Sequence, residues 1–150
     1  MKRLILLPIM TVVLTIVASQ SATFALDVHL NNKDVQCHVT STGDGVHCFG
    51  TITGLGNLAG QTIDAFVTVD FTCRNKAGNV VVGQSAGQQS DITIDSNGNA
   101  SIDVTTASVK QHGCTFSDGH TASFGKFATI RVFDQNGNEV KGSPLLVEIT

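Results

Sequence analysis

The chain has 150 residues with a formal net charge of −3, and it contains no Trp and no Tyr. It also has no run of basic residues, so it lacks both the positive charge and the Trp and Tyr rings that nucleic-acid binding uses. The absence of Trp and Tyr also weakens the case for a carbohydrate-binding module, because such modules usually stack sugars on these rings. Its length predicts one domain with a buried core.

The N-terminal segment has the features of a secretory signal peptide. Lys2 and Arg3 precede a short apolar run, and small residues follow up to Ala25. The run is short for a membrane span. We predict that residues 1–25 are removed, with a cut after Ala22 as the alternative, and that residues 26–150 form one secreted, extracellular domain without stable membrane insertion. Loss of the two positive charges of Lys2 and Arg3 takes the net charge from −3 to near −5.

Residues 26–30 alternate and predict a short first strand, and residues 31–33 predict a turn. The next stretch, DVQCHVTSTGDGVHCFGTI, predicts an antiparallel hairpin with its turn at Thr42 and Gly43 and with Cys37 opposite Cys48. Opposed cysteines at a non-hydrogen-bonded position have α-carbons close enough for a disulfide. A slip of one residue would turn the apolar face of the hairpin outward, so the register is well specified.

The same register places His38 opposite His47 on the other face of the hairpin. Opposed strand positions bring their β-carbons about 5 Å apart, close enough for two imidazoles to share a copper or zinc ion. A third ligand would come from His112 or His120 in a later loop, or from Asp34.

Residues 61–73 form the clearest strand. Their apolar side chains alternate onto one face that ends at Cys73, and Phe66 is the one apolar residue on the opposite face. Glycines at 54, 56 and 60 precede this strand, but no Lys-Ser or Lys-Thr follows them, so they indicate a crossing between sheets instead of a phosphate-binding loop.

Three later segments, at residues 75–79, 95–99 and 134–138, share the pattern Asx, two spacers, Gly-Asn, which predicts tight hairpin loops. Two of them begin D-x-N-G-N like a calcium loop, but the twelve-residue pattern ending in Glu is missing. Asn99 begins the one glycosylation sequon, Asn-Ala-Ser, at such a hairpin tip.

The remaining segments favour strands as well. Alternating or β-branched runs occur at residues 80–82, 91–94, 100–105, 126–133 and 145–149, and no window has a helical period. We therefore predict an all-β fold: a two-sheet antiparallel sandwich of the immunoglobulin-like or Greek-key type, with eight or nine short strands.

Four cysteines in an exported chain predict two disulfides. Three pairings are formally open, and the hairpin register favours Cys37 with Cys48, which leaves Cys73 with Cys114. No C-x-x-C pair is present, so the cysteines are predicted to be structural and not redox-active.

Two turn-and-cysteine motifs carry a resemblance. These are C-x-G-x-x-x-GLGN from Cys48 to Asn57 and C-x-N-x-x-G-N from Cys73 to Asn79, followed by NGN and the lone Cys114. The pattern resembles small secreted two-disulfide β-sandwich proteins of bacteria and archaea, a group without an established activity. The resemblance implies a compact stapled sandwich and carries over no catalytic residue. The chain departs from the pattern in a second loop without proline and in the residues that follow Cys114.

The sequence thus favours a non-enzymatic extracellular binding or structural module, with an extracellular protein or glycan as its partner and no cofactor. No G-x-S-x-G elbow supports a hydrolytic triad. One alternative is a copper- or zinc-binding protein that uses the cross-strand histidine pair. A second alternative is a small secreted hydrolase.

Overall fold

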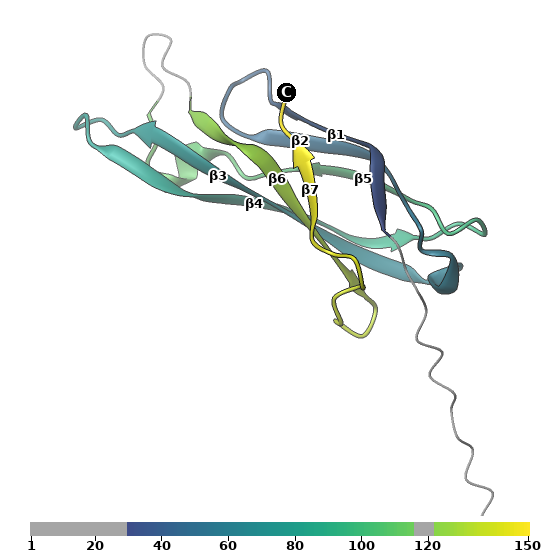
Figure 1. Cartoon of the computed structure of the whole chain (residues 1–150). Helices are drawn as coiled ribbons and strands as arrows, with labels where there is room; N and C mark the ends of the chain where they lie inside the picture. The colour runs from purple at the N-terminus through teal and green to yellow at the C-terminus, as the bar shows by residue number, and fades with distance from the viewer. Residues whose placement is uncertain (1–29, 116–121) are drawn as a thin grey trace, which may run out of the picture.

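The chain folds into two antiparallel sheets packed face to face, which confirms the predicted sandwich (Figure 1). The computed structural model describes residues 30–115 and 122–150. Within these ranges, three strands form one sheet in the order β1-β2-β5, and four form the other in the order β4-β3-β6-β7. The strands are β1 Asn31–Val39, β2 Val46–Thr53, β3 Thr62–Arg74, β4 Val80–Thr93, β5 Ala100–Thr105, β6 Ser123–Asp134 and β7 Leu145–Glu148.

Helical structure in the described ranges is limited to two 3-10 turns, η1 Gly56–Leu58 and η2 Val109–His112. No helix there is long and apolar enough to cross a membrane. The predicted signal peptide lies outside the described residues, as do residues 26–29 of the predicted first strand.

The strand order is that of an immunoglobulin-like Greek key with one change. In constant-type immunoglobulin domains the fourth strand shares a sheet with the first, second and fifth. Here β4 instead pairs along its length with β3 in the other sheet, from Val80 opposite Arg74 to Thr93 opposite Thr62. This long ribbon of β3 and β4 is the most extended part of the molecule (Figure 1).

The two sheets are joined along both edges. At one edge Thr150 donates its backbone N–H to the Cys37 carbonyl at 3.0 Å, and Val39 donates to the Thr150 carbonyl at 3.4 Å. At the other edge Ala107, just after β5, donates to the Ala86 carbonyl of β4 at 2.8 Å. These bonds cover part of the edge strands, whose open N–H and C=O groups would otherwise invite pairing with other chains.

The structure has seven strands in the described residues, fewer than the eight or nine predicted. Segments 80–82 and 91–94 belong to one 14-residue strand, β4. The sequence did not predict the middle of β4 as a strand, because the inward residues there are Gly83, Ser85 and Gly87 and not large apolar residues. A Cβ at Gly83 would lie 3.0 Å from the Phe71 ring, and one at Gly87 would lie 2.4 Å from the Thr105 carbonyl oxygen.

The predicted turn at residues 31–33 is wrong, because β1 already begins at Asn31. The local chemistry of a turn is nevertheless present: the Asn31 side-chain carbonyl accepts the Lys33 N–H at 2.9 Å. Asn31 also pairs with Thr53, and the register shifts between Asn31 and Asp34. The Asx bond therefore produces a bulge in the strand and not a chain reversal.

The core lies between the sheets, and the predicted inward face of β3 is confirmed. Its alternate residues are at most 7% exposed: Ile63, Ala65, Val67, Val69, Phe71 and Cys73. Inward positions of the other six strands, together with residues of the connecting loops, complete the main cluster. Phe71 and Cys73 instead belong to a smaller cluster with Val109, Cys114 and Ala122 at one end of the sandwich.

Both predicted disulfides are present. Cys37 and Cys48 face each other across β1 and β2 in the predicted register, with α-carbons 4.1 Å apart. Cys73 and Cys114 tie β3 to the segment after η2. On the loop-entropy model, closing chain separations of 11 and 41 residues contributes about 3 and about 4 kcal/mol respectively.

The three Asx-Gly-Asn segments are confirmed as tight loops, although the loop at residues 95–99 joins β4 to β5 in the other sheet and is not the hairpin that was predicted. In each, the first side chain accepts backbone N–H groups two and four residues later, as Asp95 does from Asn97 at 2.8 Å and from Asn99 at 2.9 Å. These bonds, from Asn99 first, lower the pKa of Asp95, and equivalent bonds led by Asn138 lower that of Asp134. The carboxylates therefore serve their own loops, which is a structural use of the D-x-N-G-N pattern.

Asp44 fastens the turn of the first hairpin to the segment that follows β5. Its carboxylate accepts hydrogen bonds from the hydroxyls of Thr42 and Ser108, and Lys110 Nζ lies 3.2 Å away. Its carbonyl accepts the Val109 N–H at 2.8 Å. The hydrogen bond from Thr42, then that from Ser108, then Lys110 lower the pKa of Asp44 to about 2.

Gly87→Ala tests the close approach of β4 to β5. The added methyl group would clash with the Thr105 carbonyl, so we expect the free energy of unfolding to fall by about 1–3 kcal/mol, measured by urea denaturation. Gly125→Ala is the control, because its Cβ would lie 3.6 Å from Asp70, an ordinary contact. An equal effect of both substitutions would contradict the packing described for this edge.

Asp44→Asn tests the fastening of the hairpin turn. The folded-state pKa of Asp44 lies below its usual 3.8, so the carboxylate stabilises the fold above about pH 4 and loses this effect as the pH falls toward 2. We expect the variant to be less stable than the parent by roughly 1–2 kcal/mol at pH 7, after allowance for solvent screening. The difference should shrink to a small fraction of its value at pH 7 as the pH falls through 2 in urea titrations. Asp70→Asn, on an exposed strand position, controls for the lost charge, and a difference of undiminished size at pH 2 would refute the role of Asp44.

Candidate functional site

The outward side of the larger sheet carries an unusual number of apolar side chains. Phe127 on β6 is 45% exposed and Leu146 on β7 is 59% exposed. Phe66 on β3 and Phe133 on β6 point the same way and are half-buried. The strand registers join them into one surface, which we call the outer apolar face: Phe66, Thr68, Phe127, Thr129, Arg131, Phe133 and Leu146.

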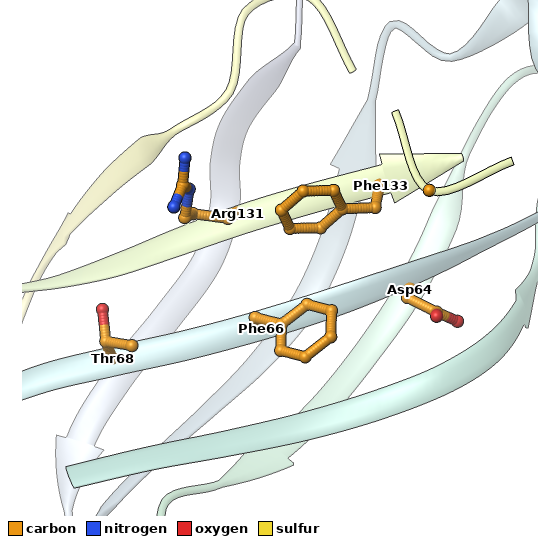
Figure 2. Close-up of a pocket in the computed structure, with 6 residues that line it drawn as sticks. Asp64, Phe66, Thr68, Arg131 and Phe133 are labelled. Atoms are coloured by element: carbon orange, nitrogen blue, oxygen red, sulfur yellow. The ribbon is translucent and has the colours of Figure 1, made fainter. Parts of the chain in front are cut away.

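A pocket of about 390 Å³ lies at one end of the outer apolar face. Its centre is formed by Phe66 and Phe133, whose ring centroids are 5.4 Å apart and whose planes are nearly perpendicular, at 87°. Figure 2 shows the two rings side by side on neighbouring strands, with Arg131 and Asp64 toward opposite ends. Thr68 and Gly137 complete the lining. The pocket is thus an apolar corner with polar groups at its rim.

The rim is held by an ion pair. The Arg131 guanidinium donates to the Glu139 carboxylate through Nε at 3.0 Å and Nη2 at 2.7 Å, and it lies 5.8 Å from the Phe133 ring centroid. The Ser143 hydroxyl donates to the same carboxylate at 2.9 Å. The hydrogen bond from Arg131, then that from Ser143, lower the pKa of Glu139, and Glu139 raises that of Arg131. The two parallel hydrogen bonds therefore hold the guanidinium in one orientation.

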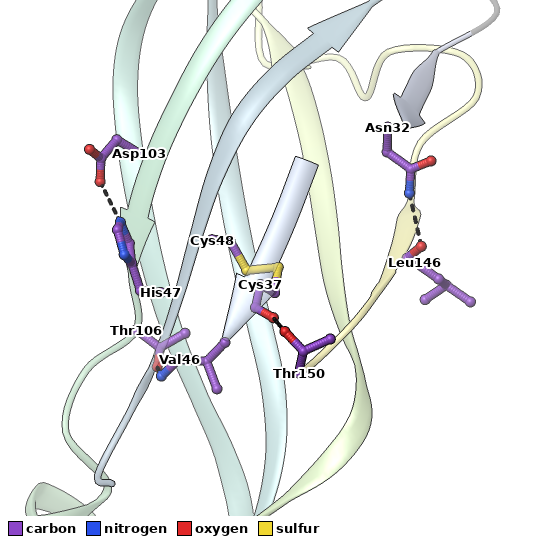
Figure 3. The surroundings of a disulfide bond; sticks show 9 residues. All are labelled: Asn32, Cys37, Val46, His47, Cys48, Asp103, Thr106, Leu146 and Thr150. Atoms are coloured by element: carbon purple, nitrogen blue, oxygen red, sulfur yellow. Dashed lines mark hydrogen bonds and ion pairs between the residues drawn. A yellow bond between two sulfur atoms is a disulfide. The ribbon is translucent and has the colours of Figure 1, made fainter. Parts of the chain in front are cut away.

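A second candidate surface is the outward side of the hairpin of β1 and β2. The predicted pairing of His38 with His47 is confirmed, with ring centroids 5.3 Å apart. The Phe49 ring packs against both imidazoles, at 5.4 and 5.1 Å between centroids. His47 Nε2 lies 2.8 Å from Asp103 Oδ1 of β5 (Figure 3). The sequence did not indicate Asp103, because nothing local reveals that β5 lies beside β2.

The other predicted metal ligands do not join this pair in the described structure. His112 is exposed at the end of η2, where its ring packs on Phe71 at 5.4 Å between centroids. His120 lies outside the described residues. Among residues 30–115 and 122–150, no group of three or more His, Cys, Asp or Glu side chains is close enough to hold a metal ion. The histidine pair therefore stands without a third protein ligand in these ranges.

The sequon residue Asn99 lies at the mouth of a polar pocket of about 540 Å³ between β4 and the smaller sheet. Its amide donates to Asp95 Oδ2 at 3.2 Å. Asp91, in the same lining, has a left-handed φ of 56°, which is uncommon for a residue other than glycine. The prediction of a hairpin tip at Asn99 is wrong, because its loop crosses from β4 in one sheet to β5 in the other. Glycosylation of Asn99 stays a prediction.

Comparison of the chain with protein-family models, with curated proteins and with solved structures finds no significant match. The resemblance to small secreted two-disulfide proteins therefore stays a prediction, and the function must be argued from the two surfaces described above.

Proposed function

We propose that the chain is a non-enzymatic, exported module that binds a partner protein through its outer apolar face. The observation that carries this proposal is the apolar pocket formed by Phe66 and Phe133. The same outward side of the sheet also carries the exposed side chains of Phe127 and Leu146, with Thr129 and Arg131 of β6 between Phe127 and the pocket. Exposed apolar side chains gathered on one face of a small domain commonly mark an interaction site.

The composition of this face favours a protein partner over a glycan. Phenylalanine and arginine are enriched in the cores of protein interfaces, and arginine is also enriched among their energetic hot spots. The perpendicular rings of Phe66 and Phe133 form a corner that suits an inserted apolar side chain, whereas a sugar ring stacks best on a flat aromatic surface. The fixed Arg131 adds an oriented donor at the rim, at little further entropic cost on binding.

The two sheets differ in what they present outward, and this supports the choice of face. The outward positions of β1 and β5 are polar: Asp34, Gln36, His38, Ser101, Asp103 and Thr105. On β2 between them, Phe49 is the one outward apolar side chain, and its ring packs against His38 and His47. On the larger sheet, by contrast, Phe127 and Leu146 are exposed at positions where a polar residue with a high strand propensity, such as threonine, would maintain the strand equally well.

Export is the second part of the proposal. The predicted signal peptide and the two disulfides support an oxidising compartment outside the cytoplasm. All four cysteines are consumed in these bridges and no cysteine is free. The bridges also stabilise the fold. The exposed apolar side chains of the larger sheet are therefore not needed to hold the domain together.

The test is a binding survey with matched variants. The purified protein is screened against arrays of proteins exported by the same organism and against glycan arrays, and each interaction is measured by biolayer interferometry. Phe127→Ser combined with Leu146→Ser should weaken binding of the protein partner at least tenfold, because interface hot spots of this kind are apolar anchors. Both side chains are already exposed, so the variant should fold normally.

Gln36→Ser combined with Thr51→Ser, on the outward side of the smaller sheet, is the control and should bind like the parent. A partner bound equally by both variants would contradict the assignment of the face. Binding to glycans alone, or to nothing in either array, would contradict the proposed class of partner.

A further inference from the structure

We propose that His38 and His47 together hold one divalent transition-metal ion, Cu²⁺ being the ion that this pair binds best. This site lies on the smaller sheet, away from the outer apolar face, and it does not depend on the proposed protein-binding function. Three features of the hairpin support such a site: the spacing of the two imidazoles, the contact of His47 with Asp103 and the fixed register of the two strands.

The spacing of the two rings suits a shared ion. Their centroids are 5.3 Å apart and their planes meet at 86°. With metal–nitrogen bonds near 2.0 Å, two neighbouring imidazoles have centroids about 4.5 Å apart on a tetragonal Cu²⁺ ion and about 5 Å apart on a tetrahedral ion. Both rings are only half-buried, so small rotations about their side-chain bonds can turn a nitrogen of each toward the ion.

Asp103 determines which nitrogen of His47 is available. Its carboxylate lies 2.8 Å from His47 Nε2 and, in the neutral imidazole, accepts the Nε2 proton. The lone pair of His47 is then on Nδ1, which becomes the ligand atom. A carboxylate behind a ligating histidine is a common feature of metal sites, where it fixes the ring and raises its basicity.

The hairpin holds the two ligands at a fixed separation. The Cys37–Cys48 disulfide lies immediately beside the histidines in the same pair of strands, on the opposite face. The Phe49 ring contacts both imidazoles. Because the strand positions of the two histidines are fixed beforehand, binding an ion requires the side chains to turn but requires little ordering of the backbone.

The chemistry of the ligands defines the class of ion. Neutral imidazole suits zinc, copper and nickel, whereas calcium and magnesium require oxygen ligands. Affinity for a given nitrogen site rises toward Cu²⁺ along the first-row metals. Two protein ligands leave the remaining coordination positions to water, so the site is open and exchangeable.

The five histidines of the chain divide into two sets that make a matched test. In one variant, H38Q/H47Q, the proposed ligands are removed. In the other, H29Q/H112Q/H120Q, only the proposed ligands remain. Each protein is titrated with CuCl₂, and separately with ZnCl₂, by isothermal titration calorimetry. The Cu²⁺ complexes are examined by pulsed electron paramagnetic resonance, which detects the number of bound imidazoles.

We expect the parent and H29Q/H112Q/H120Q to bind one Cu²⁺ each with the same affinity and with the resonance signature of two imidazoles. H38Q/H47Q should lose this binding. D103N should weaken it about tenfold, as is usual for the partner of a ligating histidine. Circular dichroism and thermal melting confirm that each variant is folded.

Three results would overturn the proposal. The first is no binding of Cu²⁺ by the folded parent protein. The second is full binding in H38Q/H47Q, and the third is loss of binding in H29Q/H112Q/H120Q, which would place the ion on the other histidines. None of these results bears on the outer apolar face, so this site and the proposed protein interface are tested separately.

Discussion

The disulfide between Cys37 and Cys48 is the constraint on which the rest of the fold depends. It joins directly opposed residues whose α-carbons are 4.1 Å apart, so β1 and β2 cannot slip relative to each other. A slip of one residue would exchange the buried and exposed faces of the hairpin. With the register locked, β2 presents a defined edge to β5, and the Cys37 carbonyl accepts the N–H of Thr150 at the edge shared with β7.

Closure of the sandwich follows from that hairpin and from small residues on β4. At the first edge, β1 pairs with the residues after β7, and at the second edge β4 approaches β5 so closely that only glycine fits at position 87. Ser85, fully buried on the same strand, donates its hydroxyl to the Ala107 carbonyl. Polar and small residues thus bring the edges together where large apolar ones would hold them apart.

The closed scaffold leaves two outward surfaces with different chemistry. The larger sheet presents phenylalanine and leucine beside an oriented arginine, which suits recognition of an apolar side chain. The smaller sheet presents two imidazoles beside a carboxylate and a phenyl ring, which suits a divalent transition-metal ion. Because the core separates the two sheets, a change on one surface has little direct route to the other, and the two proposed activities are physically independent.

The sequence by itself determined the features that depend on short-range patterns. These are the first hairpin with its opposed cysteines and histidines, the inward face of β3 and the three Asx loops, all governed by alternation or by bonds spanning at most four residues. The second disulfide followed by elimination. Phe66 was visible as an outward apolar residue, but its pairing with Phe133 was not.

Only the tertiary structure decided the features that depend on strands far apart in sequence. The neighbours β3 and β6 bring Phe66 and Phe133 together, and the neighbours β2 and β5 bring Asp103 to His47. The same long-range packing explains why β4 has small inward residues: Gly83 leaves room for the Phe71 ring, and Gly87 leaves room for the Thr105 carbonyl. Local periodicity specifies which way a side chain points, whereas its neighbours are selected by the packing of whole sheets.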